Sequence, residues 1–326
     1  MARLGARGPE LHPIGLGAMG LSGTSYGPAD DATGIAAIHA ALELGVTHID
    51  TADVYGTDGH NERLVGRAVA GRRDEAFIAT KFGFIGAGTD LRVDGRPERV
   101  GPCVAASLER LGVEVIDLLY LHRVDPEVPV EETVGAMARE VEAGRVRFLG
   151  LSEAGAASVR RAHAVHPIAA VQSEYSLWWR RPERELLPVL RELGIGLVPF
   201  SPVGRGLLGG SLTSAADLAD GDLRRGLPRF QGENLDRNLT LADAVRAVAG
   251  RLGATPGQVA LAWLLTRGDM VLPIPGMRTP GRVRENAAAA DLTLPAEAVA
   301  ALEAAFPEDL AAGDRYPEHL QRYIDG

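Results

Sequence analysis

The sequence His48-Ile49-Asp50-Thr51-Ala52-Asp53-Val54-Tyr55-Gly56 is the most informative stretch of this chain. A short apolar run leads into Asp50, and the turn residues Gly56 and Gly59 follow Tyr55. We therefore expect Asp50 at the C-terminal end of a strand and Tyr55 on the loop beyond it. A phenol has an ordinary pKa of about 10 and is a poor acid at neutral pH, unless a fixed cation favours the phenolate.

Two later apolar runs end in residues that complete such a site. The predicted strand 76–81 ends in Lys81, and the predicted strand 115–121 is followed by His122. Apolar runs and helical periodicity continue to alternate as far as Ile274, which gives about eight strand–helix pairs. The sequence predicts an α/β fold, a (β/α)8 TIM barrel with a short N-terminal hairpin over residues 4–12 and extra helices near the C-terminal end.

A competing interpretation comes from Gly15-Leu16-Gly17-Ala18-Met19-Gly20, which matches the G-x-G-x-x-G pattern of dinucleotide-binding folds. That pattern requires a helix that begins directly at the glycines, whereas residues 21–28 have the composition of a loop. The strands are also continuous apolar runs, as expected when helices cover both faces of a sheet. A doubly wound sheet, which would have fewer strands and its phosphate loop at the first turn, is the second choice.

Composition narrows the classes of function. The chain has 326 residues, 34 Lys and Arg against 43 Asp and Glu, and a net charge of -9, which disfavours a nucleic-acid partner. No stretch is long and apolar enough to span a membrane, and no secretory signal is evident. A single cysteine, Cys103, is consistent with a reducing cytoplasm. No shift in composition separates two halves, so we expect one domain over residues 1–326.

The polar residues at the predicted strand ends indicate a reaction. The C-terminal ends of barrel strands meet on one face, where they would bring Asp50, Tyr55, Lys81 and His122 together. A charged Lys81 beside Tyr55 would lower the pKa of the phenol; a decrease of two units needs about 2.7 kcal/mol. Tyr55 would then act as a general acid toward a carbonyl oxygen. Because no nucleophile with a paired base is present, we expect carbonyl reduction by hydride from a cofactor.

Two glycine- and arginine-containing segments are candidates for holding that cofactor. Residues 199–207 leave a strand with two glycines around Arg205, and backbone N–H groups in such a turn bind pyrophosphate. Residues 274–286 run from the last strand into a helix whose first turn carries Arg278, Arg282 and Arg284. Arginines there suit a dianionic phosphate, which favours NADP(H) over NAD(H).

Several of these motifs together resemble the aldo-keto reductases. They are Asp50-Thr51-Ala52 with Tyr55-Gly56, Lys81 after an apolar strand, Leu121-His122, Gly150-Leu151-Ser152, and Ile274-Pro275-Gly276 with Glu285-Asn286. The resemblance implies a catalytic tetrad of Asp50, Tyr55, Lys81 and His122, with Tyr55 as proton donor. It further implies that the cofactor NADP(H) is bound by Ser152, Gln172, Ser201, Val203, Gly204, Arg205, Gly276, Arg278, Arg282, Glu285 and Asn286. Tyr175 or a neighbour would stack on the nicotinamide ring.

The sequence departs from that family at two positions. Glu153 stands where many members have asparagine, and in this the chain resembles a microbial and plant branch of the family described as auxin-induced-like or pyridoxal reductase-like. Met277 replaces a common hydroxyl residue. The first departure concerns the third contact to the carboxamide of the cofactor. The second concerns one contact to its phosphate, which the backbone would have to supply.

The sequence predicts NADPH-dependent reduction of small aldehydes or ketones to alcohols. One alternative is an NADPH-binding sensor subunit with slow turnover, similar to the potassium-channel β subunits that resemble this family. Another is an isomerase or hydrolase that uses Asp50 and His122. Substrate identity and oligomeric state cannot be read from the sequence. The candidates for the substrate wall are Met19, Tyr26, Phe84, Trp178, Trp179 and the long connection 202–238.

Overall fold

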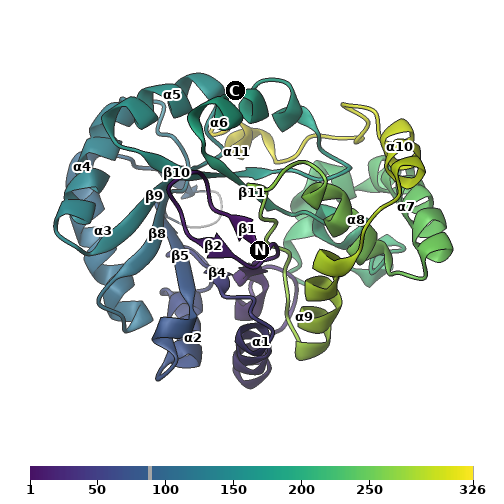
Figure 1. The fold of residues 1–326 in the computed structure, drawn as a ribbon, viewed down its shortest axis with the longest axis horizontal. Helices are drawn as coiled ribbons and strands as arrows, with labels where there is room; N and C mark the ends of the chain where they lie inside the picture. Colours follow the sequence, from purple (N-terminus) through teal and green to yellow (C-terminus); the bar gives the residue numbers. More distant parts are fainter. Residues whose placement is uncertain (87–89, 326) are drawn as a thin grey trace.

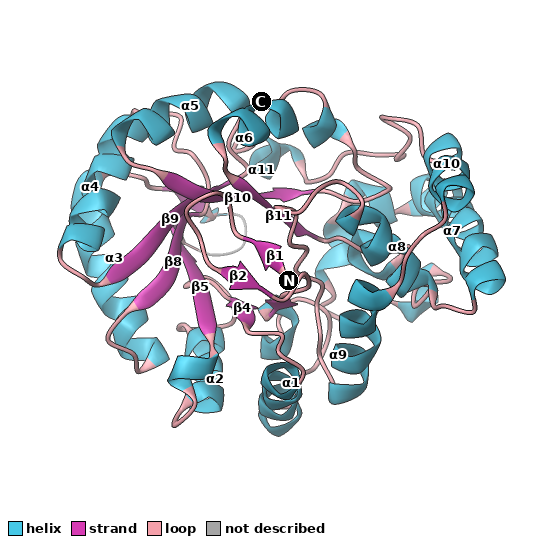
Figure 2. Cartoon of the chain, in the orientation of Figure 1, coloured by secondary structure: helices cyan, strands magenta, loops and turns pink. Residues whose placement is uncertain are grey.

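The computed structural model describes residues 1–86 and 90–325, so the glycine-rich loop predicted over 83–96 lies partly outside the described residues. Seven parallel strands form one sheet that curves around a central axis (Figures 1 and 2). In spatial order they are β11 (Gly196–Phe200), β10 (Ile168–Glu174), β9 (Val146–Ser152), β8 (Ile116–Leu121), β5 (Phe77–Phe82), β4 (His48–Asp50) and β3 (Leu16–Gly17).

Residues 271–276 close the ring between β11 and β3. The amides of Leu272 and Ile274 donate to β11, and the carbonyls of Pro273 and Pro275 accept from the residues around β3. Isolated parallel bridges join Val271 to Leu197 and Gly276 to Gly17. Pro273 and Pro275 have no N–H to donate toward β3, so this segment forms no full ladder. The predicted barrel is confirmed, but its eighth strand is reduced to bridges.

Helices surround the sheet (Figure 1). Helix α1 begins after Asp30, whose carboxylate accepts from the Thr33 amide at 2.8 Å, and α8 has a Thr255–Gln258 capping box. The helices are α1 (Asp31–Glu43), α2 (His60–Val69), α3 (Pro97–Leu111), α4 (Val130–Glu142), α5 (Ala156–Val165), α6 (Leu186–Leu193), α7 (Gly232–Leu252), α8 (Pro256–Leu265), α9 (Pro280–Ala287), α10 (Ala296–Ala305) and α11 (Glu318–Gln321).

The N-terminal hairpin crosses one end of the barrel, as predicted. It consists of β1 (Ala2–Arg3) and β2 (Glu10–Leu11), which pair antiparallel. Leu4 and Leu11 are buried in a cluster with Phe77, Leu118 and other side chains that fill the barrel interior. A larger apolar cluster lies between the strands and the helices. The hairpin closes one end, which leaves the C-terminal strand ends to form the site.

Two connections on the strand-end side have structure of their own. A small hairpin of β6 (Phe84–Ile85) and β7 (Arg92–Val93) follows β5. The connection after β11 contains short 3-10 turns at Gly204–Gly206, Ala215–Asp217, Leu223–Gly226 and Pro228–Phe230. Helix α7 begins at Gly232, within the long connection predicted over 202–238, because tertiary contacts hold its polar first turns. Asn238, for example, is buried and donates to the carbonyls of Arg229 and Ala312.

Among the described residues, no helix is both long enough and apolar enough to cross a membrane.

Candidate active site

Asp50, Tyr55 and Lys81 meet at the strand-end face of the barrel. The ammonium Nζ of Lys81 lies 2.6 Å from Oδ1 of Asp50 and 3.3 Å from the hydroxyl of Tyr55. Nζ also donates to the carbonyl of Thr51 at 2.8 Å, so its three protons all have acceptors. Lys81 is fully buried and Asp50 nearly so. The three side chains that the sequence places at or beyond strand ends therefore form one connected group.

The pKa of Tyr55 differs from the sequence expectation. Burial raises the pKa of Tyr55 above its ordinary value, and Lys81 opposes this without overcoming it. Asp50 adds to the rise, because its negative charge disfavours a phenolate nearby. The predicted net decrease in the pKa of Tyr55 is therefore wrong for this structure. Burial lowers the pKa of Lys81, but Asp50 and Tyr55 raise it more, so the ammonium stays charged.

His122 lies across from Tyr55 at the end of β8. The rings of Tyr55 and His122 are edge to face with their centroids 6.0 Å apart, and Phe84 packs against the other side of His122. Burial, together with the charges of Arg123 and Lys81, holds the pKa of His122 well below its ordinary value. His122 is therefore neutral at physiological pH and has one ring N–H to donate. Its Nδ1 is buried without a hydrogen-bond partner in the described chain.

Ser152 and Gln172, the predicted carboxamide ligands, lie beside this group. Gln172 Nε2 donates to Oδ2 of Asp50 at 2.7 Å, which fixes the carboxylate from the side opposite Lys81. The hydroxyl of Ser152 accepts from Nη1 of Arg123 at 3.2 Å. Both residues line the cavity described next. Arg123 was not singled out by the sequence, although it directly follows His122 at a strand end.

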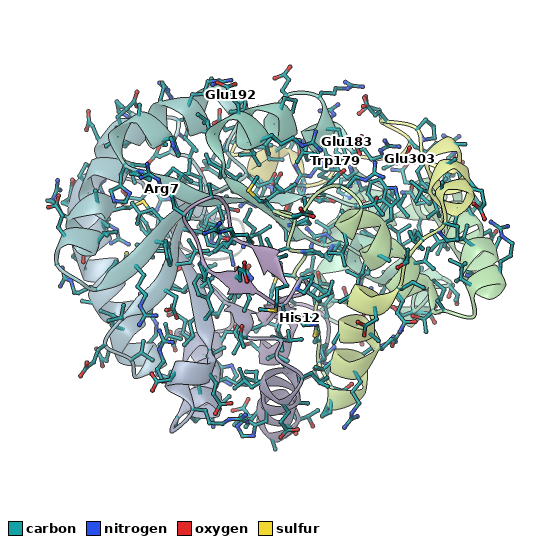
Figure 3. The ribbon with its side chains drawn as sticks, viewed as in Figure 1. Arg7, His12, Trp179, Glu183, Glu192 and Glu303 are labelled. Atoms are coloured by element: carbon teal, nitrogen blue, oxygen red, sulfur yellow. The ribbon has the colours of Figure 1, made fainter. Side chains whose placement is uncertain are left out.

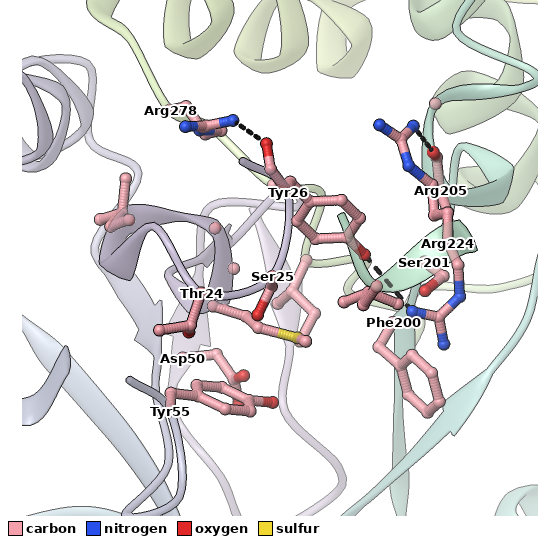
Figure 4. A pocket seen from close by; sticks show the side chains of 18 of the residues that line it. Thr24, Ser25, Tyr26, Asp50, Tyr55, Phe200, Ser201, Arg205, Arg224 and Arg278 are labelled. Carbon is pink, nitrogen blue, oxygen red and sulfur yellow. Dashed lines mark hydrogen bonds between the residues drawn. The ribbon is translucent and has the colours of Figure 1, made fainter. Parts of the chain in front are cut away.

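A cavity of about 1030 Å³ extends from these residues across the barrel mouth. Figure 4 shows Asp50 and Tyr55 at one end and Arg278, bonded to the Tyr26 carbonyl, at the other. Of the residues predicted from the sequence, those lining it are Asp50, Tyr55, His122, Ser152, Gln172, Ser201, Val203, Arg205, Gly276, Arg278, Arg282, Glu285 and Asn286. Lys81 does not line the cavity itself and is connected to it by its contacts with Asp50 and Tyr55.

The turn after β11 brings Ser201, Val203 and Arg205 to the cavity but not Gly204. Gly204 donates its amide to the Ser201 carbonyl at 2.9 Å, and a Cβ there would lie 3.0 Å from the Trp178 ring. This glycine shapes a turn with φ of 59° and is absent from the cavity wall. Arg205 lines the cavity, and its guanidinium lies 3.4 Å from the hydroxyl of Tyr26 and 3.4 Å from the hydroxyl of Tyr316.

At the far end, the predicted phosphate-binding arginines have protein partners. Arg278 donates to the carbonyls of Tyr26, Gly27 and Pro28, and thereby holds the loop that follows β3 across the cavity. Arg282 pairs with Glu285 at 2.7 Å, and its side chain is 49% exposed. Both lie at the start of α9, whose N-cap is Thr279. Arg282 is thus the more accessible of the two.

Glu153 does not line the cavity. Its carboxylate accepts from the amide of Glu174 at 2.8 Å and pairs with Arg315 at 2.7 Å. Arg315 also pairs with Glu174, which in turn pairs with Arg229. This buried cluster anchors the segment that follows α10, because Arg315 lies in that segment. That segment supplies cavity-lining residues, namely Tyr316, Pro317, His319, Leu320 and Tyr323.

Four further side chains that the sequence analysis names lie away from the cavity. Tyr175 is fully buried, donates to Glu183 and packs on Trp263, so the prediction that it stacks on a nicotinamide ring is wrong. Met277 is buried in the core. Trp178 packs on Phe230, and Trp179 (Figure 3) lies under the guanidinium of Arg315. Met19, Tyr26 and Phe84 do line the cavity, as predicted.

Sequence comparison decides the family. The sequence pattern of the Aldo/keto reductase family matches residues 13–306, which is most of the chain. The chain belongs to the aldo/keto reductase family. It is 44% identical over 323 residues to "Probable aldo-keto reductase 1" from Glycine max, covering 98% of this chain and 93% of the relative.

Two solved structures of this family have the same fold. The glycerol dehydrogenase from Gluconobacter oxydans is 30% identical with a TM-score of 0.81, over 97% of this chain and 93% of that one. A thermostable aldo-keto reductase in complex with the inhibitor epalrestat is 29% identical with a TM-score of 0.74, over 93% and 98%. As an aldo-keto reductase, this chain is an oxidoreductase of carbonyl compounds, and members of the family generally use NAD(P)H.

Proposed function

We propose that this aldo-keto reductase reduces aldehydes or ketones to alcohols with NADPH, and that Tyr55 is the general acid. The observation that carries the proposal is the contact of 3.3 Å between the hydroxyl of half-buried Tyr55 and Nζ of fully buried Lys81. Tyr55 is protonated at neutral pH, as a proton donor must be, although its raised pKa makes it a weaker acid than a free phenol. A positioned general acid of this kind increases a reaction rate by a factor of about 10²–10⁴.

The neighbouring residues make that donation possible. When Tyr55 gives its proton to the carbonyl oxygen, the phenolate forms beside an ammonium that is already in place. Asp50 keeps Lys81 charged and oriented, and Gln172 holds Asp50 from its other oxygen. Neutral His122 donates a hydrogen bond to the same carbonyl oxygen and helps to place it.

The residues around the cavity fit a dinucleotide. The volume of about 1030 Å³ is large enough for both cofactor and substrate. Arg205 lines its middle and has no carboxylate within 4 Å among the described residues, which suits a pyrophosphate. Ser152 and Gln172 would hold the carboxamide, and Gly276, Glu285 and Asn286 the adenosine. When bound, NADPH supplies the hydride to the carbonyl carbon.

NADPH is proposed over NADH because two arginines stand at the far end of the cavity. Arg282 is partly exposed at the first turn of α9, where a helix N-terminus also favours an anion. Arg278 contributes less directly, since its guanidinium already bonds three carbonyls. We also propose that residues 1–326 act as one domain in a reducing cytoplasm, supported by a cavity lined from Gly17 to Tyr323 and by the single cysteine.

A panel of aldehydes and ketones, followed by NADPH and NADH absorbance, tests this function. We expect carbonyl-dependent oxidation of NADPH, with aldehydes faster than ketones. Tight NADPH binding with no turnover on any member of the panel would favour the sensor-subunit alternative. Absence of any thermal shift or fluorescence change with either cofactor would favour an isomerase or hydrolase.

A further inference from the structure

Arg123 is a buried cation with no carboxylate to balance it. Only 9% of the residue is exposed, and no Asp or Glu oxygen of the described chain lies within 4 Å of its guanidinium. Burying an unpaired charge is unfavourable, and proteins usually pair such groups. The chain has a net charge of -9, so an unbalanced cation here is a local exception.

One edge of the Arg123 guanidinium is held and the other is free. Nη1 donates to the His122 carbonyl at 2.6 Å and to the Ser152 hydroxyl at 3.2 Å, and the group lies over the Phe84 ring. Within the described residues, Nε and Nη2 have no hydrogen-bond acceptor, yet they are not among the buried unpartnered atoms. Because Arg123 lines the cavity, this free edge reaches into it.

The other arginines of the cavity are already accounted for. Arg224 pairs with Asp222, and Arg282 pairs with Glu285. Arg278 bonds backbone carbonyls, and Arg205 lies where the proposed cofactor has its pyrophosphate. Arg123 lies at the opposite end, beside His122 and Tyr55, where the reacting carbonyl would sit. The nicotinamide carboxamide expected near Ser152 is neutral and does not balance this charge.

We propose that Arg123 binds a carboxylate of the substrate, so that the preferred substrates are aldehydes or ketones carrying a carboxylate on a short apolar body. An Nε–Nη2 edge matches the two oxygens of a carboxylate and binds them in a bidentate manner. Phe84, which packs against both His122 and Arg123, supplies an apolar wall at this end, and Met19 and Leu91 also line the cavity. This inference rests on the proposed carbonyl reduction and specifies its substrate class.

The experiment compares 4-carboxybenzaldehyde and its 2- and 3-isomers with their methyl esters, in the parent enzyme and in Arg123→Gln. Each acid and ester pair has the same reacting aldehyde and differs in charge. We expect the parent to prefer at least one acid over its ester in kcat/KM. We expect Arg123→Gln to reduce that preference at least about tenfold, mainly through KM, since a charge-assisted contact is lost. Arg123→Lys should restore part of it.

Two controls separate charge recognition from a structural role. Arg161→Gln removes an exposed arginine of α5 that does not line the cavity, and it should leave the acid-to-ester ratio unchanged. Binding of benzoate and benzamide to each protein with cofactor, measured by thermal shift, reports recognition without turnover. Benzoate should stabilise the parent more than benzamide does, and Arg123→Gln should lose the difference.

The outcomes are distinct. A parent that prefers the esters in every pair, or an Arg123→Gln variant that loses acid and ester activity equally, overturns the proposal and leaves Arg123 as a positioning residue for Ser152 and His122. If no aldehyde is reduced at all, the proposed function fails. In that case, loss of benzoate binding in Arg123→Gln still supports the anion site, and retained benzoate binding refutes it.

Discussion

The hydroxyl of Tyr55 lies 3.3 Å from the ammonium of Lys81, where Lys81 is fully buried and Tyr55 is half-buried. Two opposing effects act on this phenol. The adjacent cation favours the phenolate, while burial and the Asp50 carboxylate disfavour it, and burial is the largest of these. Tyr55 is thus a protonated donor at rest whose product form is stabilised, which is the requirement for an acid in a reduction.

The pH dependence of reduction follows from this balance. Since the pKa of Tyr55 is raised above its ordinary value of about 10, the acid form persists through the neutral and mildly alkaline range. We expect kcat/KM for a neutral aldehyde to stay level from about pH 7 to pH 9 and to fall only above about pH 10. Steady-state rates across that range check this. A decrease with an apparent pKa near 8 would mean that the cation outweighs burial.

Lys81→Met separates the structural and catalytic roles of the ion pair. The substitution leaves the buried Asp50 carboxylate without its cation and should lower the free energy of unfolding by about 3–5 kcal/mol. The double variant Asp50→Asn/Lys81→Met removes both charges and should regain most of that stability in chemical denaturation. The rate of aldehyde reduction should be at least about a hundredfold below that of the parent in both variants. Recovery of activity along with stability would show that Lys81 acts only through folding.

Arg315→Met tests the buried cluster that fastens the C-terminal segment. It leaves Glu153 and Glu174 short of a partner, so we expect a loss of about 3–5 kcal/mol in unfolding free energy and faster proteolysis after α10. KM should rise, because that segment carries Tyr316 and Tyr323 into the cavity. Glu318→Gln, at an exposed position of the same segment that does not line the cavity, is the control. Equal effects of the two substitutions would contradict a role for the cluster.

The same cluster predicts a dependence of stability on acid. Burial raises the pKa of Glu174, but the opposite effect of Arg315 and Arg229 is larger, and together they bring the pKa down to about 2. A carboxyl with a depressed folded-state pKa stabilises fully above its ordinary value of about 4.3 and loses this as pH falls toward 2. The loss of stability over that range should be smaller in Arg315→Met than in the parent, as measured by denaturation at fixed pH. If the free energy of unfolding fell equally with pH in both proteins, Arg315 would not be the cause of the lowered pKa of Glu174.

Cofactor preference should depend more on Arg282 than on Arg278. Arg282→Ala removes an accessible cation at the start of α9 and should narrow the NADPH-to-NADH ratio of kcat/KM about tenfold. Arg278→Ala also releases the loop over Tyr26–Pro28, so it should weaken both cofactors. Kinetics with each cofactor distinguish the two. An unchanged ratio in the double variant would place the 2′-phosphate elsewhere.

The sequence was sufficient for the barrel and for the group around Lys81 because both depend on local patterns. Apolar strand runs mark where each strand ends, and the barrel geometry then brings those ends to one face. Asp50, Lys81, Gln172 and Ser152 follow from this alone. The reduced eighth strand was also visible in principle, since Pro273 and Pro275 lack the N–H that a ladder needs.

The remaining features depend on contacts between distant residues. Glu153 pairs with Arg315 from the far end of the chain, and no local signal links them. Tyr175 points into the core because its hydroxyl donates to Glu183 and its ring packs on Trp263. The sign of the pKa shift of Tyr55 depends on how deeply the phenol is buried, which a sequence does not give. Arg123 was within reach of sequence reasoning, but its missing carboxylate was not.

The most direct test of the account is Tyr55→Phe, which removes only the phenolic oxygen. The variant should bind NADPH as the parent does, measured by fluorescence titration, and should lose at least about 10²–10⁴ in kcat for a good aldehyde. Such a result would establish Tyr55 as the acid beside Lys81. A variant that binds the cofactor and reduces the aldehyde at the parent's rate would contradict the mechanism.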